Sequence, residues 1–417
     1  MADWSQLPKD LLDLIAKRLE SPFYKLRFRS VCSSWRSSVS SRPRRRLAGR
    51  FPFLPNDGII SSTTTWGFHL SRRTIFLINP CSQTTPQNKN SWLIKMEEDL
   101  PGRMQLLNPL SRSQLKSLPL DFPKVMNLLN FQVIDLGHEY VLHYINFKPF
   151  ASSSLGDVGS LYMEKVVFMC LGSETETDVF ALLTIHVSGK LALFMSEDKR
   201  WSIINDMPSP YDDVVLFKDE FYAVDSNGRT VFVELSSNLS LVAEPVFGGD
   251  KKFLVESDGQ LLLVDMYLSV DFGDDVDVFE DVDEVFDKFI RERTVRFKVF
   301  KLNWEGKRWV EVTSLGDRVL FLGDDCTFSA LASDLSGCKG NCIFFRDNNF
   351  YMTGEEGDVN GVFRGRDIGV CDLDNGSIKP LVDYPEYSKL FWPPPDWVAS
   401  TTSGVSIVLS IMKALLV

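Results

Sequence analysis

Short apolar runs separated by turn signals fill most of this 417-residue chain beyond about residue 65. Five of the signals are the dipeptides Ser188-Gly189, Asn227-Gly228, Asp258-Gly259, Glu305-Gly306 and Asn375-Gly376. Such dipeptides close β-hairpins because Gly and Asn adopt positive φ angles at low cost. No amphipathic helical stretch of comparable length interrupts the runs, so crossover helices and a parallel sheet are not expected. The pattern predicts a large antiparallel β body.

The apolar runs place strands at thirteen readable positions. They are residues 166–171, 180–187, 191–195, 214–217, 221–224, 230–235, 253–256, 261–264, 296–302, 309–312, 319–322, 342–345 and 369–373. More than 300 residues of β-structure exceed one sandwich, so a β-propeller built from repeated four-stranded units is the better fit.

Internal similarity supports repetition. Lys199-Arg200-Trp201 follows one apolar run, and Lys307-Arg308-Trp309 follows another 108 residues later. This distance fits two or three repeats of roughly 40–50 residues. A further repeated motif occurs at residues 77–80 and 106–109, both of which end in Asn-Pro. We expect about six blades.

The N-terminal segment differs from the body because its apolar residues have helical spacing. The first stripe has Pro8 at its start, where proline is tolerated, and Ser21-Pro22 separates it from a second stripe. The first stripe is Leu7, Leu11, Leu12, Ile15 and Leu19, and the second is Phe28, Val31, Cys32 and Trp35. A unit of this size rarely buries so much apolar surface alone, so it packs on the rest of the chain or on another protein.

The helical segment resembles the F-box, a short module that binds a Skp-family adaptor. The resemblance rests on Leu7-Pro8-Lys9-Asp10-Leu11-Leu12 and on Val31-Cys32-Ser33-Ser34-Trp35-Arg36. Related plant modules commonly carry an Asp where this chain has residues 21–25, Ser-Pro-Phe-Tyr-Lys. The resemblance implies an adaptor interface formed by the ten residues Leu7, Pro8, Leu11, Leu12, Ile15, Leu19, Phe28, Val31, Cys32 and Trp35. The alternative is an ordinary helical hairpin that caps a larger domain.

The order of motifs along residues 3–398 is similar to one plant family, the F-box proteins of the SKIP or KIB type. The body motifs are residues 221–225, 253–257, 315–317, 337–341 and 392–395, together with Asn108-Pro109 and the two Arg-Trp pairs. The resemblance implies an all-α F-box at residues 3–50, a linker at 51–65 and an all-β, antiparallel, propeller-like domain at 66–398. A hydrophobic C-terminal tail, 399–417, lies outside it.

Charge is unevenly distributed. Residues 1–50 hold 12 Lys and Arg against 4 Asp and Glu, and the remainder holds 33 against 52. Arg42, Arg44, Arg45 and Arg46 form a basic cluster suited to nuclear import or phosphate contact, although a solvated helix end is the simpler interpretation. The remaining chain is acidic and lacks a basic face, so no nucleic-acid binding is predicted. We expect the protein in the nucleus, the cytoplasm or both.

Two biased segments stand out. Residues 271–287 contain nine acidic and no basic side chains. The spacing of these acidic residues is not that of a calcium-binding loop. Two interpretations remain: a solvated insertion, or a segment that contacts a basic partner. The apolar run at 405–417 contains Lys413 and is too short to span a bilayer, so no membrane association is predicted.

The chain shows no nucleophile elbow, phosphate loop or zinc motif. Its seven cysteines are scattered along the chain, and we predict that they are reduced and mostly buried thiols. Adjacent acids such as Asp324-Asp325 and Glu355-Glu356 are predicted to be turn residues, because neighbours in a strand face opposite sides. No catalytic residue, metal or cofactor is predicted.

The function that follows is a non-catalytic subunit of an SCF (Skp–cullin–F-box) ubiquitin ligase. Its F-box would bind the Skp adaptor and, through it, a cullin, while the propeller would hold a target protein for ubiquitination and proteasomal degradation. Two alternatives remain at this point: an F-box scaffold outside any ligase, and a propeller enzyme such as a glycosidase.

Overall fold

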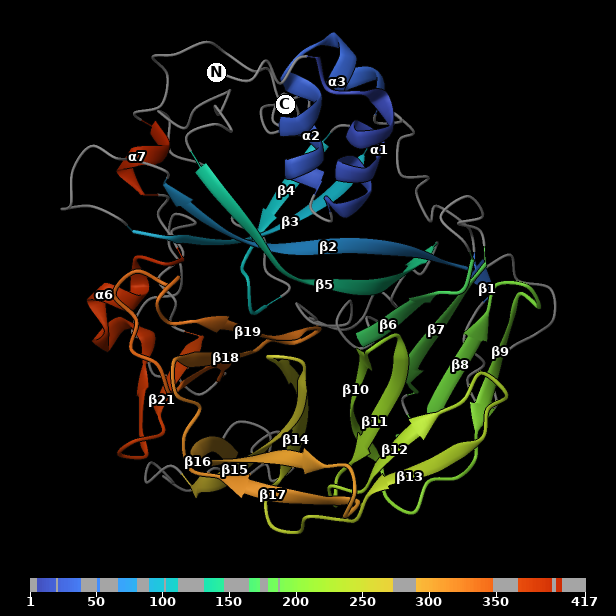
Figure 1. The fold of residues 1–417 in the computed structure, drawn as a ribbon. Helices are drawn as coiled ribbons and strands as arrows, with labels where there is room; N and C mark the ends of the chain where they lie inside the picture. The colour runs from blue at the N-terminus through green and yellow to red at the C-terminus, as the bar shows by residue number, and fades with distance from the viewer. Residues whose placement is uncertain are drawn as a thin grey trace.

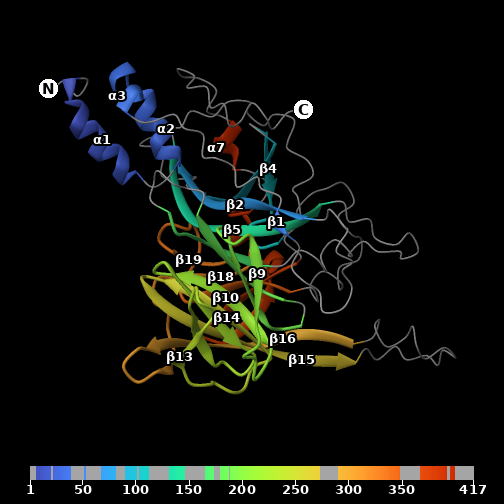
Figure 2. The ribbon, with the colours of Figure 1, turned by 90° about the vertical axis from the view of Figure 1, so that its right-hand side faces the viewer.

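A computed structural model describes residues 6–19, 22–38, 51–52, 67–80, 90–100, 103–111, 131–145, 165–172, 179–186, 188–272, 290–347, 367–391 and 395–399. Three helices come first: α1(Lys9–Arg18), α2(Pro22–Ser30) and α3(Ser33–Ser38). They lie together outside the sheets (Figures 1 and 2). The rest of the described chain is almost entirely β-structure, as the sequence predicts.

The first sheet has nine strands but consists of two halves. One half is β2(Gly67–Pro80), β3(Trp92–Leu100), β4(Arg103–Leu107) and β5(Phe131–Ile145), with the short β1(Phe51–Pro52) on β2. The other half is β6(Lys165–Cys170), β7(Phe180–Ile185), β8(Leu191–Met195) and β9(Arg200–Ile204). The halves join only where Tyr140 pairs with Val166 and Val141 with Lys165. Each half is therefore a propeller blade of its own.

Three further sheets complete the body. The third blade is β10(Tyr211–Phe217), β11(Glu220–Asp225), β12(Thr230–Val233) and β13(Leu239–Ala243). The fourth is β14(Lys251–Ser257), β15(Gln260–Phe272), β16(Ile290–Asn303) and β17(Arg308–Val312). The fifth has the order β19-β18-β20-β21-β22, formed by β18(Arg318–Leu322), β19(Thr327–Leu331), β20(Cys342–Arg346), β21(Ile368–Asp372) and β22(Ser377–Pro380). It is followed by η4(Leu381–Asp383), α6(Pro385–Ser388) and α7(Asp396–Ala399).

Five inner strands close into a ring. β5 pairs with β6, β6 contacts β10, β10 contacts β14, β14 contacts β19, and β19 returns to β5. The sheets accordingly surround a common centre (Figure 1). The described residues form five blades, so the expectation of six was wrong. The expectation of wholly antiparallel pairing also needs one correction, because β18 and β20 run parallel.

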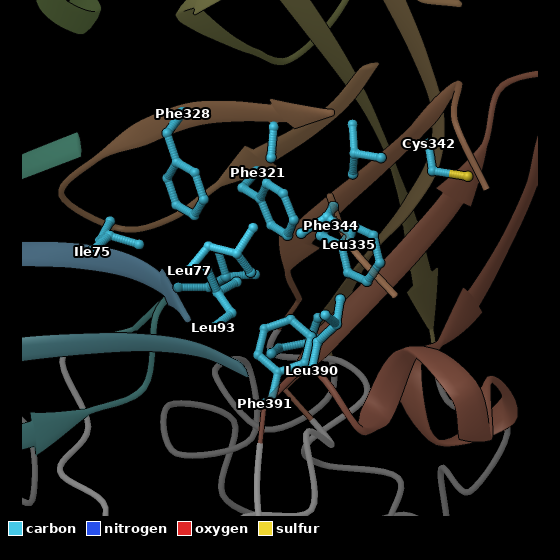
Figure 3. Close-up of a cluster of buried hydrophobic side chains, with 14 of the residues drawn as sticks. Ile75, Leu77, Leu93, Phe321, Phe328, Leu335, Cys342, Phe344, Leu390 and Phe391 are labelled. Carbon is cyan, nitrogen blue, oxygen red and sulfur yellow. The ribbon is translucent and has the colours of Figure 1, made fainter. Parts of the chain in front are cut away.

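A hydrophobic cluster joins the first blade to the fifth. Figure 3 shows Ile75, Leu77 and Leu93 facing Phe321, Phe328, Phe344 and Phe391. Two hydrogen bonds fix the same joint: Trp92 Nε1 donates to the Phe391 carbonyl at 2.9 Å, and Leu93 N donates to the Leu390 carbonyl at 2.7 Å. The C-terminal residues thus close the ring by burying apolar surface against the first blade.

Each of the thirteen predicted strands corresponds to a strand of the structure. The repeat is also confirmed, because Trp201 lies in β9 and Trp309 in β17, the last strands of the second and fourth blades. Lys199 and Lys307 precede these strands with φ angles of 48° and 45°. The 108-residue distance therefore equals two blades, and the positive φ angle near Gly306 belongs to Lys307.

Candidate functional site

The N-terminal helices have a small core of their own. Leu12 is fully buried, and Ala16 and Phe28 are nearly so. Leu7, Leu19 and Trp35 pack against this core, and the Phe28 and Trp35 ring centroids are 4.4 Å apart. These side chains hold the three helices together.

A second set of apolar side chains on the helices faces outward. Leu11, Leu14 and Ile15 follow i, i+3, i+4 spacing on one side of α1 and are 46%, 56% and 39% exposed. Val31, between α2 and α3, is 54% exposed. We call these four residues the apolar helix face. Exposed apolar residues that neighbour one another on a helix, as Leu11, Leu14 and Ile15 do, mark an interaction surface.

The structure divides the predicted adaptor interface. Leu11, Ile15 and Val31 are exposed as expected, Pro8 is exposed beside them and Cys32 is half-buried. Leu12 and Phe28 lie in the module interior, where they hold the helices together and present no outward surface. The predicted second helical stripe is wrong, because α2 ends at Ser30 and α3 begins at Ser33.

Leu14 was missed by the sequence reasoning although it has the largest exposed fraction of the three α1 residues. The available signal was its position three residues after Leu11, on the same side of the helix.

Arg42, Arg44, Arg45 and Arg46 lie outside the described residues. So do the acidic segment beyond Phe272, as far as residue 287, and the tail from residue 400.

A cavity of about 550 Å³ lies where the five inner strands converge. Every blade contributes to its wall: His138 from β5, Lys165 from β6, Leu216 from β10, Glu256 from β14 and Ser329 from β19. Asp258 and Arg318 line it as well and form an ion pair of 2.9 Å. We call this space the channel cavity.

Asp213 connects the inner strands of three blades. Its Oδ1 accepts a hydrogen bond from Val214 N at 2.9 Å and pairs with the ammonium group of Lys165. Its Oδ2 accepts a hydrogen bond from Leu254 N at 2.9 Å. The carboxylate is 3% exposed, so these partners replace its hydration and fix β6, β10 and β14 around the channel cavity.

Neighbouring Asp212 gives the fold a pH dependence. Its carboxylate accepts a hydrogen bond from Lys252 N at 2.8 Å. Burial, together with the nearby Asp213 charge, raises the pKa of Asp212 to about 6, against 3.8 for a free side chain, although Lys251 and Lys252 oppose the rise. Because the folded state binds this proton more tightly, its contribution to stability is complete below about pH 4 and is lost as the pH rises through about 6.

We therefore expect Asp212→Asn to gain stability relative to the original chain as the pH rises from about 4 to about 7. The pKa shift sets an upper limit of about 3 kcal/mol for this gain, and solvent near the half-buried group reduces it. Urea unfolding at both pH values measures it. A difference between the two proteins that is the same at both pH values would contradict the assignment to Asp212.

A buried ion cluster lies between the first and fifth blades, beside the channel cavity. Arg73 binds Glu97 and Glu139 at 3.0 Å each and lies 4.0 Å from Asp325, and Lys95 binds Glu139 at 3.0 Å. We call these five residues the closure cluster. Burial alone lowers the pKa of Arg73, but Glu139, Glu97 and Asp325 outweigh it and raise that pKa above its usual value. Asp325 lies between β18 and β19, in a turn as the sequence indicates, but its side chain is also a buried ion-pair partner, which the sequence does not indicate.

Potential metal ligands do not cluster among the described residues, and most of the described cysteines are at least partly buried. The described residues contain no group of three His, Cys, Asp or Glu side chains able to hold a metal ion. Cys326, Cys342 and Cys371 are buried as predicted, whereas Cys170 is exposed. Burial raises the pKa of Cys326 and of Cys371 to about 12, which keeps both thiols protonated.

Among the described helices, none combines the length and apolar character needed to cross a membrane.

The described chain is thus a helical module with an outward apolar face, placed before a five-bladed propeller. The F-box domain model matches residues 4–47, and the KIB1-4 beta-propeller model matches residues 67–370. The chain belongs to the F-box proteins that carry a KIB1-4 β-propeller.

Curated relatives agree over nearly the whole length. The chain is 50% identical to the F-box protein SKIP23 of Arabidopsis thaliana over 410 residues, which cover 96% of each chain. A second F-box protein of the same species is 40% identical over 418 residues, 98% of this chain and 97% of the relative. A third, described as a putative F-box protein, is 33% identical and covers 90% of this chain and 92% of its own.

Proposed function

We propose that this protein is the substrate-recognition subunit of an SCF ubiquitin ligase. The observation that carries the proposal is the apolar helix face on a module whose own core is already complete. Leu11, Leu14 and Ile15 are not needed to fill that core, so their exposure is explained by a partner that covers them. The F-box match supports a Skp-family adaptor as this partner.

The mechanism needs no catalytic group in this chain. The adaptor joins the protein to a cullin, which carries the ubiquitin-transfer machinery, and the propeller holds the target protein. Binding then raises the local concentration of the target's lysines near the conjugating enzyme. Proteasomal degradation of the target follows from its ubiquitination. We place this activity in the nucleus, the cytoplasm or both.

We expect Leu14→Ala combined with Ile15→Ala to weaken binding to a Skp-family adaptor at least tenfold. Each side chain would be removed from the buried centre of the interface, where truncation costs about 2 kcal/mol or more. Calorimetric titration of the purified adaptor into the full chain measures the loss. Helix content by circular dichroism stays unchanged, because both side chains lie outside the module core.

The matched control is Val310→Ala, which truncates a 43% exposed apolar side chain on β17 and leaves adaptor binding unchanged. Phe28→Ala and Trp35→Ala are less informative, since both residues stabilise the helices. Undiminished adaptor binding by the double variant would contradict the proposal. Adaptor binding without recruitment of a cullin to the reconstituted complex would instead identify a scaffold outside the ligase.

A further inference from the structure

The channel cavity contains one charged side chain that the fold does not use. Glu256, on β14, lines the cavity, is exposed, and has no hydrogen-bond or ion-pair partner among the described residues. The other charged residues of the wall are committed: Lys165 pairs with Asp213, Arg318 with Asp258, and Asp325 belongs to the closure cluster. Glu256 is therefore available to a ligand.

The charges around the cavity favour a cation. The Lys165–Asp213 and Arg318–Asp258 pairs are each neutral as a unit. The closure cluster combines two cations, Arg73 and Lys95, with three carboxylates and so carries one net negative charge. Glu256 adds another. Of the closure cluster only Asp325 lines the cavity, so the charged side chains of the wall are Lys165, Arg318, Glu256, Asp258 and Asp325, with a net charge of −1. A concave space concentrates this negative potential and attracts positive groups.

The apolar side chains of the wall restrict the chemical structure of a cationic ligand. Leu136, Phe168, Leu216 and Phe328 line the same cavity as Glu256. Its volume of about 550 Å³ lies within the range of small-ligand sites, which is roughly 300–1,000 Å³. A ligand with an aliphatic stem and a positive end would bury the stem against these side chains and present its charge to the carboxylate.

We propose that the channel cavity binds an alkylammonium or guanidinium group, with the Glu256 carboxylate as its ion-pair partner. Such a group has two sources: a Lys or Arg side chain on an extended segment of a partner protein, and a free aliphatic polyamine. Both place the same chemistry in the same site. The site belongs to the propeller alone, so it stands whether or not the helices bind an adaptor.

The test is calorimetric titration of the full chain with three probes. They are spermidine, a blocked pentapeptide Gly-Gly-Lys-Gly-Gly, and the same peptide with Glu in place of Lys. We expect a cationic probe to bind, the Glu peptide not to bind, and Glu256→Gln to weaken the cation at least tenfold. Added salt weakens binding further, because the attraction is electrostatic.

Glu311→Gln is the matched control. Glu311 is exposed on β17, the outermost strand of the fourth blade, and pairs with Lys298 at 3.2 Å, so the same substitution there leaves binding unchanged. Unfolding midpoints of both variants stay at the original value, since neither side chain is buried. Binding of spermidine alone assigns the site to a free polyamine, and binding of the Lys peptide assigns it to a protein side chain. The proposal is overturned if neither cation binds, or if Glu256→Gln binds as tightly as the original chain.

Discussion

Arg73→Met is expected to lower the free energy of unfolding by about 3–5 kcal/mol, a large effect for one substitution. The guanidinium is 5% exposed and is the only side chain in the closure cluster that contacts Glu97, Glu139 and Asp325 together. Methionine fills similar space but removes the cation that contacts all three buried carboxylates, and Lys95 is then the one cation left within the closure cluster. Unpaired buried charge costs far more than the lost contacts.

Urea unfolding followed by tryptophan fluorescence measures the change. Arg346→Met is the matched control, because Arg346 is 39% exposed and pairs with Asp324, the neighbour of Asp325, at 2.7 Å. An exposed pair contributes about 1 kcal/mol or less. Equal losses in the two variants would show that the closure cluster contributes no more than a surface ion pair.

The importance of Arg73 follows from how the ring closes. Asp325 lies in the turn between β18 and β19, and Asp324 N in the same turn donates to the Leu110 carbonyl of the first blade at 3.0 Å. Gly323 has no room for a side chain, since a Cβ atom there would lie 2.9 Å from the Cys326 carbonyl oxygen. The cluster and this turn therefore position β19 as the last inner strand beside the channel cavity.

The sequence predicts thirteen strands from their apolar runs, and it misses others in which polar residues interrupt the run. β19 is an example: it holds Thr327 and Ser329 at alternate positions and follows two adjacent acids, which read as a turn. The buried role of Asp325 depends on Arg73, more than 250 residues away, and no local pattern reports such a pairing. β2 and β5 were missed for a similar reason, because they pair across 50 intervening residues.

The helices show the same limit on a smaller scale. Helical spacing places Leu11, Leu12 and Ile15 in one apolar stripe. Periodicity alone does not show which residues of such a stripe face the core and which face outward. Packing separates them: Leu12 turns toward Phe28, and Leu11 and Ile15 remain outside. The F-box resemblance supplied the function of the stripe, and the structure assigns which of its side chains a partner can reach.

Asp265→Ala is expected to destabilise the fourth blade as strongly as Arg73→Met destabilises ring closure, by about 3–5 kcal/mol. Asp265 and Lys252 are both fully buried, and Oδ1 of Asp265 lies 2.6 Å from the Lys252 ammonium group. Without the carboxylate, the ammonium group keeps only the Gly249 carbonyl, at 2.9 Å. Asp265 Oδ2 also accepts a hydrogen bond from Gly249 N at 3.0 Å, so the loop before β14 loses an anchor.

The double variant Lys252→Met, Asp265→Leu separates the two contributions. Removing both charges at once eliminates the unpaired ammonium group, so we expect the double variant to recover at least half of the stability lost by Asp265→Ala. The stability that the double variant still lacks measures the contribution of the hydrogen bond between Gly249 N and Asp265. Urea unfolding midpoints of the single and double variants give both values. A double variant no more stable than the single one would show that the loop anchor, and not the buried charge, accounts for the effect of Asp265.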